Sequence, residues 1–184
     1  MEKQIAHEQE KEMLMQQAKA VGALPVLGWC SVAALVRNGK RQLRNVRQVR
    51  WRLTEWEGKE FQTAVEWLLD NWYLVQQEGT SGIDSLRRAG KLRETVDSQE
   101  RRMPLLCALA DAWLESDVSL TSENFIIFLE EVQKNLPLSE KELALFLQVV
   151  RLRMLEQLNY WCDELEHACI LWEKRKQRIL IPKS

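Results

Sequence analysis

The segment from Glu60 to Gln77 constrains the fold more than any other stretch, because it joins strong helical periodicity to a large aromatic content. At 3.6 residues per turn, one broad side of this segment is apolar. That side consists of Phe61, Ala64, Val65, Leu68, Leu69, Trp72 and Val75. Trp67 and Leu74 lie on a second side, which also carries Asn71. A helix that is apolar on two sides usually lies between neighbours, so we expect residues 60–77 to form the central buried helix of a bundle.

The composition favours an all-α fold around that helix. Hydrophobic residues make up 46% of the 184 residues and charged residues 29%. With Gly 7 and Pro 4, the chain has too few of either residue for a sheet-rich or disordered protein. A chain of this length usually forms one domain. We therefore expect residues 1–184 to form a single helical domain, a bundle of about six to seven helices.

Glycine and proline predict several boundaries in the first part of the chain. Residues 1–22 are polar with a thin apolar line, which predicts a helix whose beginning can fray. Residues 26–37 predict a short buried helix that stops at Asn38 and Gly39. Residues 78–103 contain three glycines and several short polar residues, so we expect a long connection there.

Capping signals predict the later helices. Pro104 suits a first turn and opens a helix. Thr121 or Ser122 caps the next one. Ser139 and Glu142 form a capping box at the start of a last region that has neither glycine nor proline. Leucine, tryptophan and methionine recur there by threes and fours, a seam suited to packing along other helices.

The segment from Lys40 to Trp56 has the strongest charge bias. Its cations and the one just before it are Arg37, Lys40, Arg41, Arg44, Arg47, Arg50 and Arg52, with no acidic residue before Glu55. The favoured interpretation is a solvated basic side that packs against acidic neighbouring helices. The alternative is a surface for phosphates, anionic lipid or an acidic partner, because Trp51 lies among the cations.

These patterns give a set of candidate interface residues on two predicted helices. An exposed indole flanked by arginine is a plausible contact point for a partner. The candidates are Arg41, Arg44, Trp51, Trp67, Asn71 and Leu74.

No residue pattern predicts catalysis. Glu66 and Asp70 are carboxylates one turn apart, but the Glu-x-x-His element of a helical metal site is missing. We expect both to be buried structural groups that bond to backbone or arginine. The spacing of Cys162, His167 and Cys169 does not match a structural zinc site. We therefore expect no catalytic residue, no metal ligand and no cofactor in this chain.

The termini and cysteines indicate a cytoplasmic setting. The first residues, MEKQIAHEQEKE, fit no secretory signal, and the longest apolar run is too short to span a membrane. Four widely spaced cysteines indicate reduced thiols rather than a disulfide framework. The net charge of −1 provides no global field for nucleic acid, so we expect no nucleic-acid partner.

Ala64–Gln77, with the sequence AVEWLLDNWYLVQQ, resembles the Glu-Trp-Leu-Leu-Asp-Asn segment of the cyclic β-1,2-glucan synthases. In that family the segment lies in the helical region before the glycosyltransferase domain. The resemblance continues through the helix that Pro104 opens and the turn at Pro137 and Leu138, and it covers Ala64 to Leu158. It departs from the family pattern between these elements, where tyrosine and proline are replaced by Leu86 and Gly90.

The resemblance implies a non-catalytic helical scaffold within a glycosyltransferase that builds β-1,2-linked glucan from UDP-glucose. The partners would be the remaining domains of that polypeptide, which can attach to the inner membrane, or another protein. One alternative is a free-standing helical protein–protein interaction module, which includes self-association as a homo-oligomer. A further alternative is an arginine-mediated binder of nucleic acid or anionic lipid.

Overall fold

The computed structural model describes residues 2–116 and 118–180, and it is mostly helical, with 73% of residues in helices. The predicted helical class is therefore confirmed, but the all-α description is incomplete because three short strands are present. The helices of the described residues are α1 (Glu2–Gly22), α2 (Ala33–Leu53), α3 (Gln62–Ala89), α4 (Leu105–Leu114), α5 (Ser122–Gln133) and α6 (Glu140–Leu180). The strands are β1 (Gly28–Ser31), β2 (Lys91–Val96) and β3 (Arg102–Pro104).

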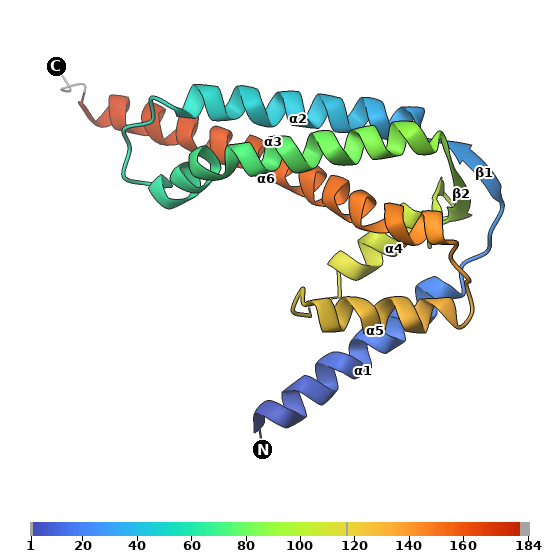
Figure 1. The fold of residues 1–184 in the computed structure, drawn as a ribbon. Coiled ribbons are helices and arrows are strands. Elements are labelled where there is room, and N and C mark those ends of the chain that lie inside the picture. The colour runs from blue at the N-terminus through green and yellow to red at the C-terminus, as the bar shows by residue number, and fades with distance from the viewer. Residues whose placement is uncertain (1, 117, 181–184) are drawn as a thin grey trace.

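Helices α2, α3 and α6 pack against one another and form a three-helix layer (Figure 1). Each contributes an apolar stripe to a shared core, as helical periodicity requires. The buried residues of this core include Val46, Val49, Leu53, Val65, Leu68, Ile83, Leu86, Leu152 and Leu155. Trp72, on the predicted apolar side of α3, is half-buried, whereas Phe61 on that side is 43% exposed.

A second group of helices consists of α1, α4 and α5. Helix α1 packs against α4 and α5, and α4 joins this group to α6 (Figure 1). An aromatic cluster fills its core, with ring centroids of Trp113 and Phe128 5.5 Å apart and those of Phe125 and Phe146 also 5.5 Å apart. Such ring pairs add stability beyond their buried area. The group therefore has a packed core of its own, into which α6 contributes Phe146.

The predicted connection over residues 78–103 is wrong. Helix α3 continues to Ala89, and two of the three glycines that suggested a loop, Gly79 and Gly82, lie inside it. A Cβ on Gly79 would lie 3.2 Å from Leu43, and one on Gly82 would lie 3.0 Å from Leu152. These glycines let α2 and α6 approach α3 closely, and this tertiary packing outweighs the low helix propensity of glycine.

The predicted short helix over residues 26–37 is also wrong. Its first half is strand β1, which pairs antiparallel with β2, and β2 pairs antiparallel with β3. In this register Gly28 faces Glu94, and Thr95 faces Met103. The predicted stop at Gly39 does not occur, because α2 continues through it. A Cβ there would lie 3.1 Å from Ile83, so Gly39 serves close packing rather than termination.

Candidate functional site

An apolar groove, here the α3–α6 groove, runs along the junction of these two helices. It consists of two hollows of about 500 Å³ and about 270 Å³ that share Trp67 and Leu158. Between Arg151 and Ala168 on α6, it extends about 25 Å at the helical rise of 1.5 Å per residue. Grooves of this length accept a helix of about 17 residues.

Helical periodicity builds both walls of the α3–α6 groove. The α3 wall follows Ala64, Trp67, Asn71, Leu74 and Glu78, in steps of three and four. The α6 wall follows Arg151, Met154, Leu158, Trp161, Leu165 and Ala168, in steps of three and four. A surface with this spacing is the one that a helix presents to a packing partner.

The groove walls are open to solvent although they are apolar. Trp67 is 51% exposed, Leu74 54%, Met154 45% and Trp161 66%. The floor of the groove includes Leu68 and Leu155, which are buried in the core of the three-helix layer. Large apolar patches of this kind on otherwise polar proteins mark interaction surfaces.

The charged groups at the groove are mainly acidic. Arg151 is the cation that lines it, and its Nε lies 2.8 Å from Glu78 Oε2. That oxygen accepts no aligned hydrogen bond, so the pair is an electrostatic contact. Glu164 lines the groove and makes no ion pair with any described residue.

The structure separates the sequence-predicted interface residues into two places. Trp67 and Leu74 line the α3–α6 groove. Asn71 follows the same stripe, and its side-chain amide donates to the carbonyl of Trp67 at 2.8 Å. Arg41, Arg44 and Trp51 are exposed on α2 and do not line this groove. These six residues therefore do not form one continuous site.

The α6 wall was not predicted from the sequence to be an exposed surface. Met154, Leu158 and Trp161 belong to the predicted seam of α6, which was expected to pack within the bundle. The apolar seam of α6 was the sequence signal that could have identified this surface. Its exposure depends on how many neighbours α6 has, and in the described structure no helix covers this side.

Among the described residues, Arg52, near the end of the helix, is the only cation of α2 that pairs with an acidic neighbour. Arg52 forms a bidentate ion pair with Glu166, and Asn45 donates to both Asn159 and Asp163 at 2.8 Å. These contacts join α2 to α6. By contrast, Arg41 and Arg44 form no ion pair with the described residues, so the predicted packing against acidic helices explains only part of this charge.

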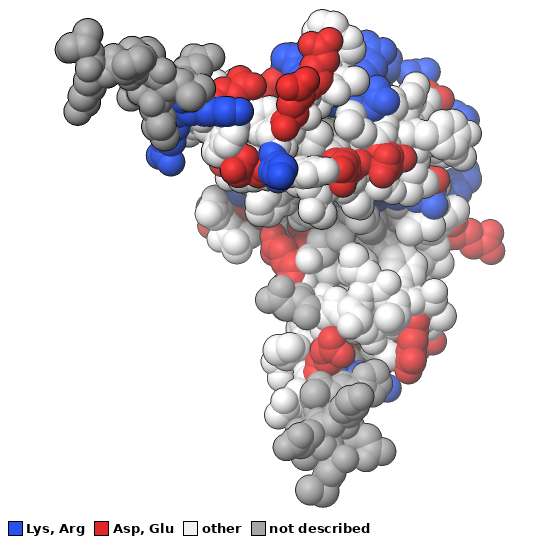
Figure 2. All heavy atoms as spheres, turned by 90° about the vertical axis from the view of Figure 1, so that its left-hand side faces the viewer, with Lys and Arg blue, Asp and Glu red and all other residues white. Residues whose placement is uncertain are grey.

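Figure 2 shows the side of the molecule at which α2 and α6 end and α3 begins. Side chains of both signs lie on its upper part, and a largely uncharged surface lies below them. No single sign dominates this side. The mixture agrees with a net charge of −1 and does not provide the extended basic surface that nucleic acid requires.

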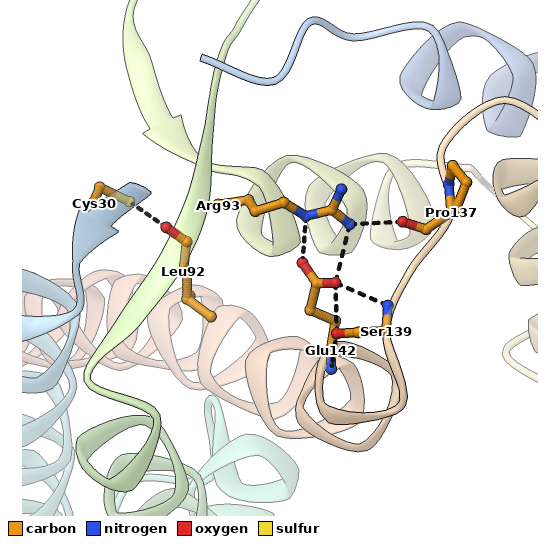
Figure 3. A network of polar contacts seen from close by, with 6 residues as sticks. All are labelled: Cys30, Leu92, Arg93, Pro137, Ser139 and Glu142. Carbon is orange, nitrogen blue, oxygen red and sulfur yellow. Dashed lines mark hydrogen bonds and ion pairs between the residues drawn. The ribbon is translucent and has the colours of Figure 1, made fainter. Parts of the chain in front are cut away.

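A polar network ties β2 to the beginning of α6 (Figure 3). Arg93 donates to both carboxylate oxygens of Glu142, at 2.5 and 3.0 Å, and to the carbonyl of Pro137 at 2.9 Å. Glu142 also accepts from the backbone N–H and hydroxyl of Ser139, which confirms the predicted capping box. Burial acts to raise the pKa of Glu142, but the bonds from Arg93 and Ser139 outweigh it and lower the pKa. The network is structural, since every acceptor is satisfied within the chain.

The residues considered for chemistry do not form a reactive site. Glu66 and Asp70 are exposed rather than buried as predicted, because their side of α3 faces neither α2 nor α6. Glu66 accepts a hydrogen bond from Gln62 at 2.7 Å within the same helix. Cys162 is buried whereas His167 is exposed, and the described residues contain no cluster that could hold a metal ion.

The cysteine thiols are protonated at neutral pH. Burial raises the pKa of Cys107 and of Cys162 to about 12. Burial also raises the pKa of Cys30 and of Cys169. All four are free thiols, and a thiol with a raised pKa is a weak nucleophile.

No protein-family model, no curated protein and no solved structure matches this chain. None of the described helices is both long and apolar enough to cross a membrane. The α3–α6 groove is therefore the candidate functional site.

Proposed function

We propose that this chain is a non-catalytic helical module that docks a protein helix in the α3–α6 groove. The observation that carries this proposal is the pair of exposed stripes along the groove, one on each helix. An apolar groove between two helices is a common binding site for a third, amphipathic helix. Trp67 and Trp161 would become the buried anchors of the interface, because tryptophan commonly dominates binding energy.

The charged residues at the α3–α6 groove indicate which charge the partner helix carries. Glu164 lacks a cationic partner in the described structure, and Arg151 is neutralised by Glu78. A complementary helix carries an apolar stripe flanked by lysine or arginine. An acidic helix would meet like charges and bind more weakly. The proposed occupant is therefore a basic amphipathic helix of another protein or of another domain.

The resemblance to the cyclic β-1,2-glucan synthases offers one source of that partner. Under this proposal the module belongs to a glycosyltransferase that uses UDP-glucose, and α3 docks the remaining domains. The support is the residue similarity from Ala64 to Leu158, which includes Trp67 and Leu74 of the groove. Its test is to substitute Trp67 in the longer polypeptide, where unchanged assembly and glucan synthesis would count against it.

The docking itself is tested with two synthetic 18-residue helical peptides that share a leucine stripe. One peptide carries flanking lysines and the other carries flanking glutamates. We expect the lysine peptide to bind the chain in a fluorescence-anisotropy titration and Trp161→Glu to weaken it by about tenfold or more. Tyr160→Glu is the matched control, because Tyr160 is 59% exposed beside Trp161 but does not line the groove.

Three outcomes would overturn the proposal. Equal affinity of the Trp161→Glu and Tyr160→Glu variants would show that the peptide binds elsewhere. Preference for the glutamate peptide would contradict the assigned partner chemistry. A dimer in sedimentation equilibrium that Trp161→Glu dissolves would show that a second copy of this chain occupies the groove instead.

A further inference from the structure

A second groove, the α2–α3 groove, lies between α2 and α3 and has the opposite character. It has a volume of about 290 Å³. Three cations of α2 and one of α3 line it, together with two neutral polar side chains. These residues are Lys40, Arg44, Arg47, Arg87, Gln76 and Thr80. The groove therefore concentrates positive charge that the whole chain, at −1, does not have.

The cations of α2 reach the groove because of their spacing. Lys40, Arg44 and Arg47 recur in steps of four and three, which places them on one side of the helix. Like charges one turn apart repel each other by about 0.2–0.5 kcal/mol per pair. This arrangement is unfavourable for folding alone, so an anion that neutralises the cations would stabilise the protein.

The protein does not neutralise these cations itself. Lys40, Arg44 and Arg47 form no ion pair with any described residue. The acid that lines the groove is Asp84, whose Oδ1 lies 3.2 Å from Arg87 Nη1. Four cations thus face one carboxylate. Arg52, which belongs to the same helix but not to the groove, is paired with Glu166, so α2 can form ion pairs where a neighbouring helix supplies an acid.

We propose that the α2–α3 groove binds the phosphate group of a phosphate-bearing ligand. Guanidinium groups donate to phosphate oxygens in pairs, and the lysine adds a point charge. The hydroxyl of Thr80 and the amide of Gln76 supply neutral donors. Trp72 forms an apolar wall, and the guanidinium of Arg50 lies 5.9 Å from the centre of its ring, which keeps further positive charge nearby.

The size of the groove limits the ligand. A volume of about 290 Å³ is near the low end of small-molecule sites and accommodates one phosphate or two linked phosphates. The cations occupy about two turns of α2, which is shorter than the backbone track that proteins use for nucleic acid. The phosphate belongs either to a free small molecule or to a lipid headgroup.

The binding test is an isothermal titration and an NMR titration of the chain with inorganic phosphate and pyrophosphate. We expect saturable binding, with amide shifts at residues 40–47 and 76–87, that the double variant Arg44→Gln and Arg47→Gln weakens at least tenfold. Arg41→Gln is the matched control, because Arg41 is an exposed arginine of the same helix that does not line the groove. Both variants should melt within a few degrees of the original chain, since the substituted side chains are exposed.

The source of the phosphate is distinguished with vesicles. Phosphatidylcholine vesicles that contain a phosphoinositide are compared with vesicles that contain phosphatidylserine at equal surface charge. Binding to the phosphoinositide vesicles alone assigns a lipid headgroup. Binding of pyrophosphate with no vesicle binding assigns a free ligand. Trp161→Glu should leave either result unchanged, because this inference does not depend on the α3–α6 groove.

Other results would overturn the inference. Equal loss of phosphate binding in Arg41→Gln and in the double variant would show a diffuse field rather than a site. Equal binding to both kinds of charged vesicle would also show a diffuse electrostatic field rather than a site. Binding to polyglutamate as strong as binding to pyrophosphate would lead to the same conclusion. Tighter binding of an RNA oligomer with a steep salt dependence would identify the groove as part of a nucleic-acid surface.

Discussion

Glu142 illustrates how one side chain can fix two elements at once. It caps the first turn of α6 through Ser139, and it holds β2 through Arg93 (Figure 3). Its side chain is 12% exposed and that of Arg93 is 18% exposed, so solvent weakens this pair less than a surface pair. Removal of one partner from such a pair leaves the other without its hydrogen bonds, which is more costly than the loss of a solvated contact.

Glu142→Gln should lower the free energy of unfolding by about 1–3 kcal/mol at pH 7. The pKa of Glu142 is lower in the folded protein than the ordinary value of 4.5. Its stabilising contribution is therefore complete above pH 4.5 and is lost as the pH falls through the lowered pKa. Urea unfolding between pH 7 and pH 3 should show the difference between the two proteins narrowing below pH 4.5.

Glu140→Gln is the control for this prediction. Glu140 lies in the same first turn of α6 but is exposed and makes no ion pair among the described residues. We expect its substitution to change the unfolding free energy by no more than about 0.5 kcal/mol. A constant difference between Glu142→Gln and the original chain down to pH 3 would contradict the role assigned to the ionised carboxylate.

At the scale of the element, the close packing of α3 against α2 and α6 depends on its glycines. Gly79 and Gly82 are buried inside a helix of 28 residues, against side chains of α2 and α6. Glycine disfavours a helix by about 1 kcal/mol relative to alanine, and this cost is repaid by the close approach of three helices. The same closeness sets the depth of the α3–α6 groove, because Gly79 lines it.

Gly82→Ala should destabilise the protein although alanine is the better helix former. The added Cβ would lie 3.0 Å from Leu152 Cγ and 3.3 Å from the carbonyl oxygen of Gln148. The backbone of α6 cannot move away without disturbing its own packing, so overpacking by about 1–3 kcal/mol exceeds the gain in propensity. The measurement is the midpoint of thermal unfolding followed by circular dichroism.

Ser81→Ala is the matched control, because Ser81 is the exposed neighbour of Gly82 in the same turn. At this exposed position the substitution changes only helix propensity, so the midpoint of thermal unfolding should stay constant or rise slightly. A rise of the midpoint in Gly82→Ala would show that α6 yields to the new methyl group, and the packing argument for these glycines would be wrong.

The sequence predicted those features of the elements that depend on neighbours along the chain. The apolar side of α3 through Val65 and Leu68, the cap at Thr121 and the capping box of α6 all follow from local periodicity and hydrogen bonding. Strand β1 was missed because its partner β2 lies more than sixty residues away, as the pairing of Gly28 with Glu94 shows. A four-residue strand carries no period long enough to recognise.

Only the part of the candidate site that depends on neighbours along the chain could be predicted from the sequence. Trp67 and Leu74 stood out because they were apolar outside the main stripe of α3. Trp161 lay on the main stripe of α6, and nothing local distinguishes a stripe that is covered from one that is open. Exposure is a property of the assembled helices. The basic residues of α2 were visible as a charge run, but the groove they form with Arg87 required the packing of α3.

At the scale of the whole molecule, α4 connects the two groups of helices. Seven of its ten residues are buried, including an unbroken run from Leu105 to Ala110. A helix that is buried on all sides lies within a core. It packs against α1 and α6 and also against β2 and β3. This central position supports the prediction that residues 1–184 behave as one domain, in which both groups unfold together.

Leu109→Ala tests that prediction, because Leu109 is completely buried in α4. Truncation of a buried leucine costs about 2–5 kcal/mol through lost burial and the cavity that remains. The readout is the rate of thiol labelling, resolved by mass spectrometry, at Cys107 in α4 and at Cys162 in the distant half of α6. Both thiols are buried with raised pKa values, so they react mainly after the protein opens.

If the molecule is one cooperative unit, Leu109→Ala accelerates labelling of Cys107 and Cys162 by the same factor. Leu120→Ala, at a side chain that is 57% exposed, should change neither rate by more than about twofold. Acceleration at Cys107 alone would mean that the three-helix layer opens independently of α4. In that case both grooves would belong to a separate unit, and the helices α1, α4 and α5 would have to be assigned a role of their own.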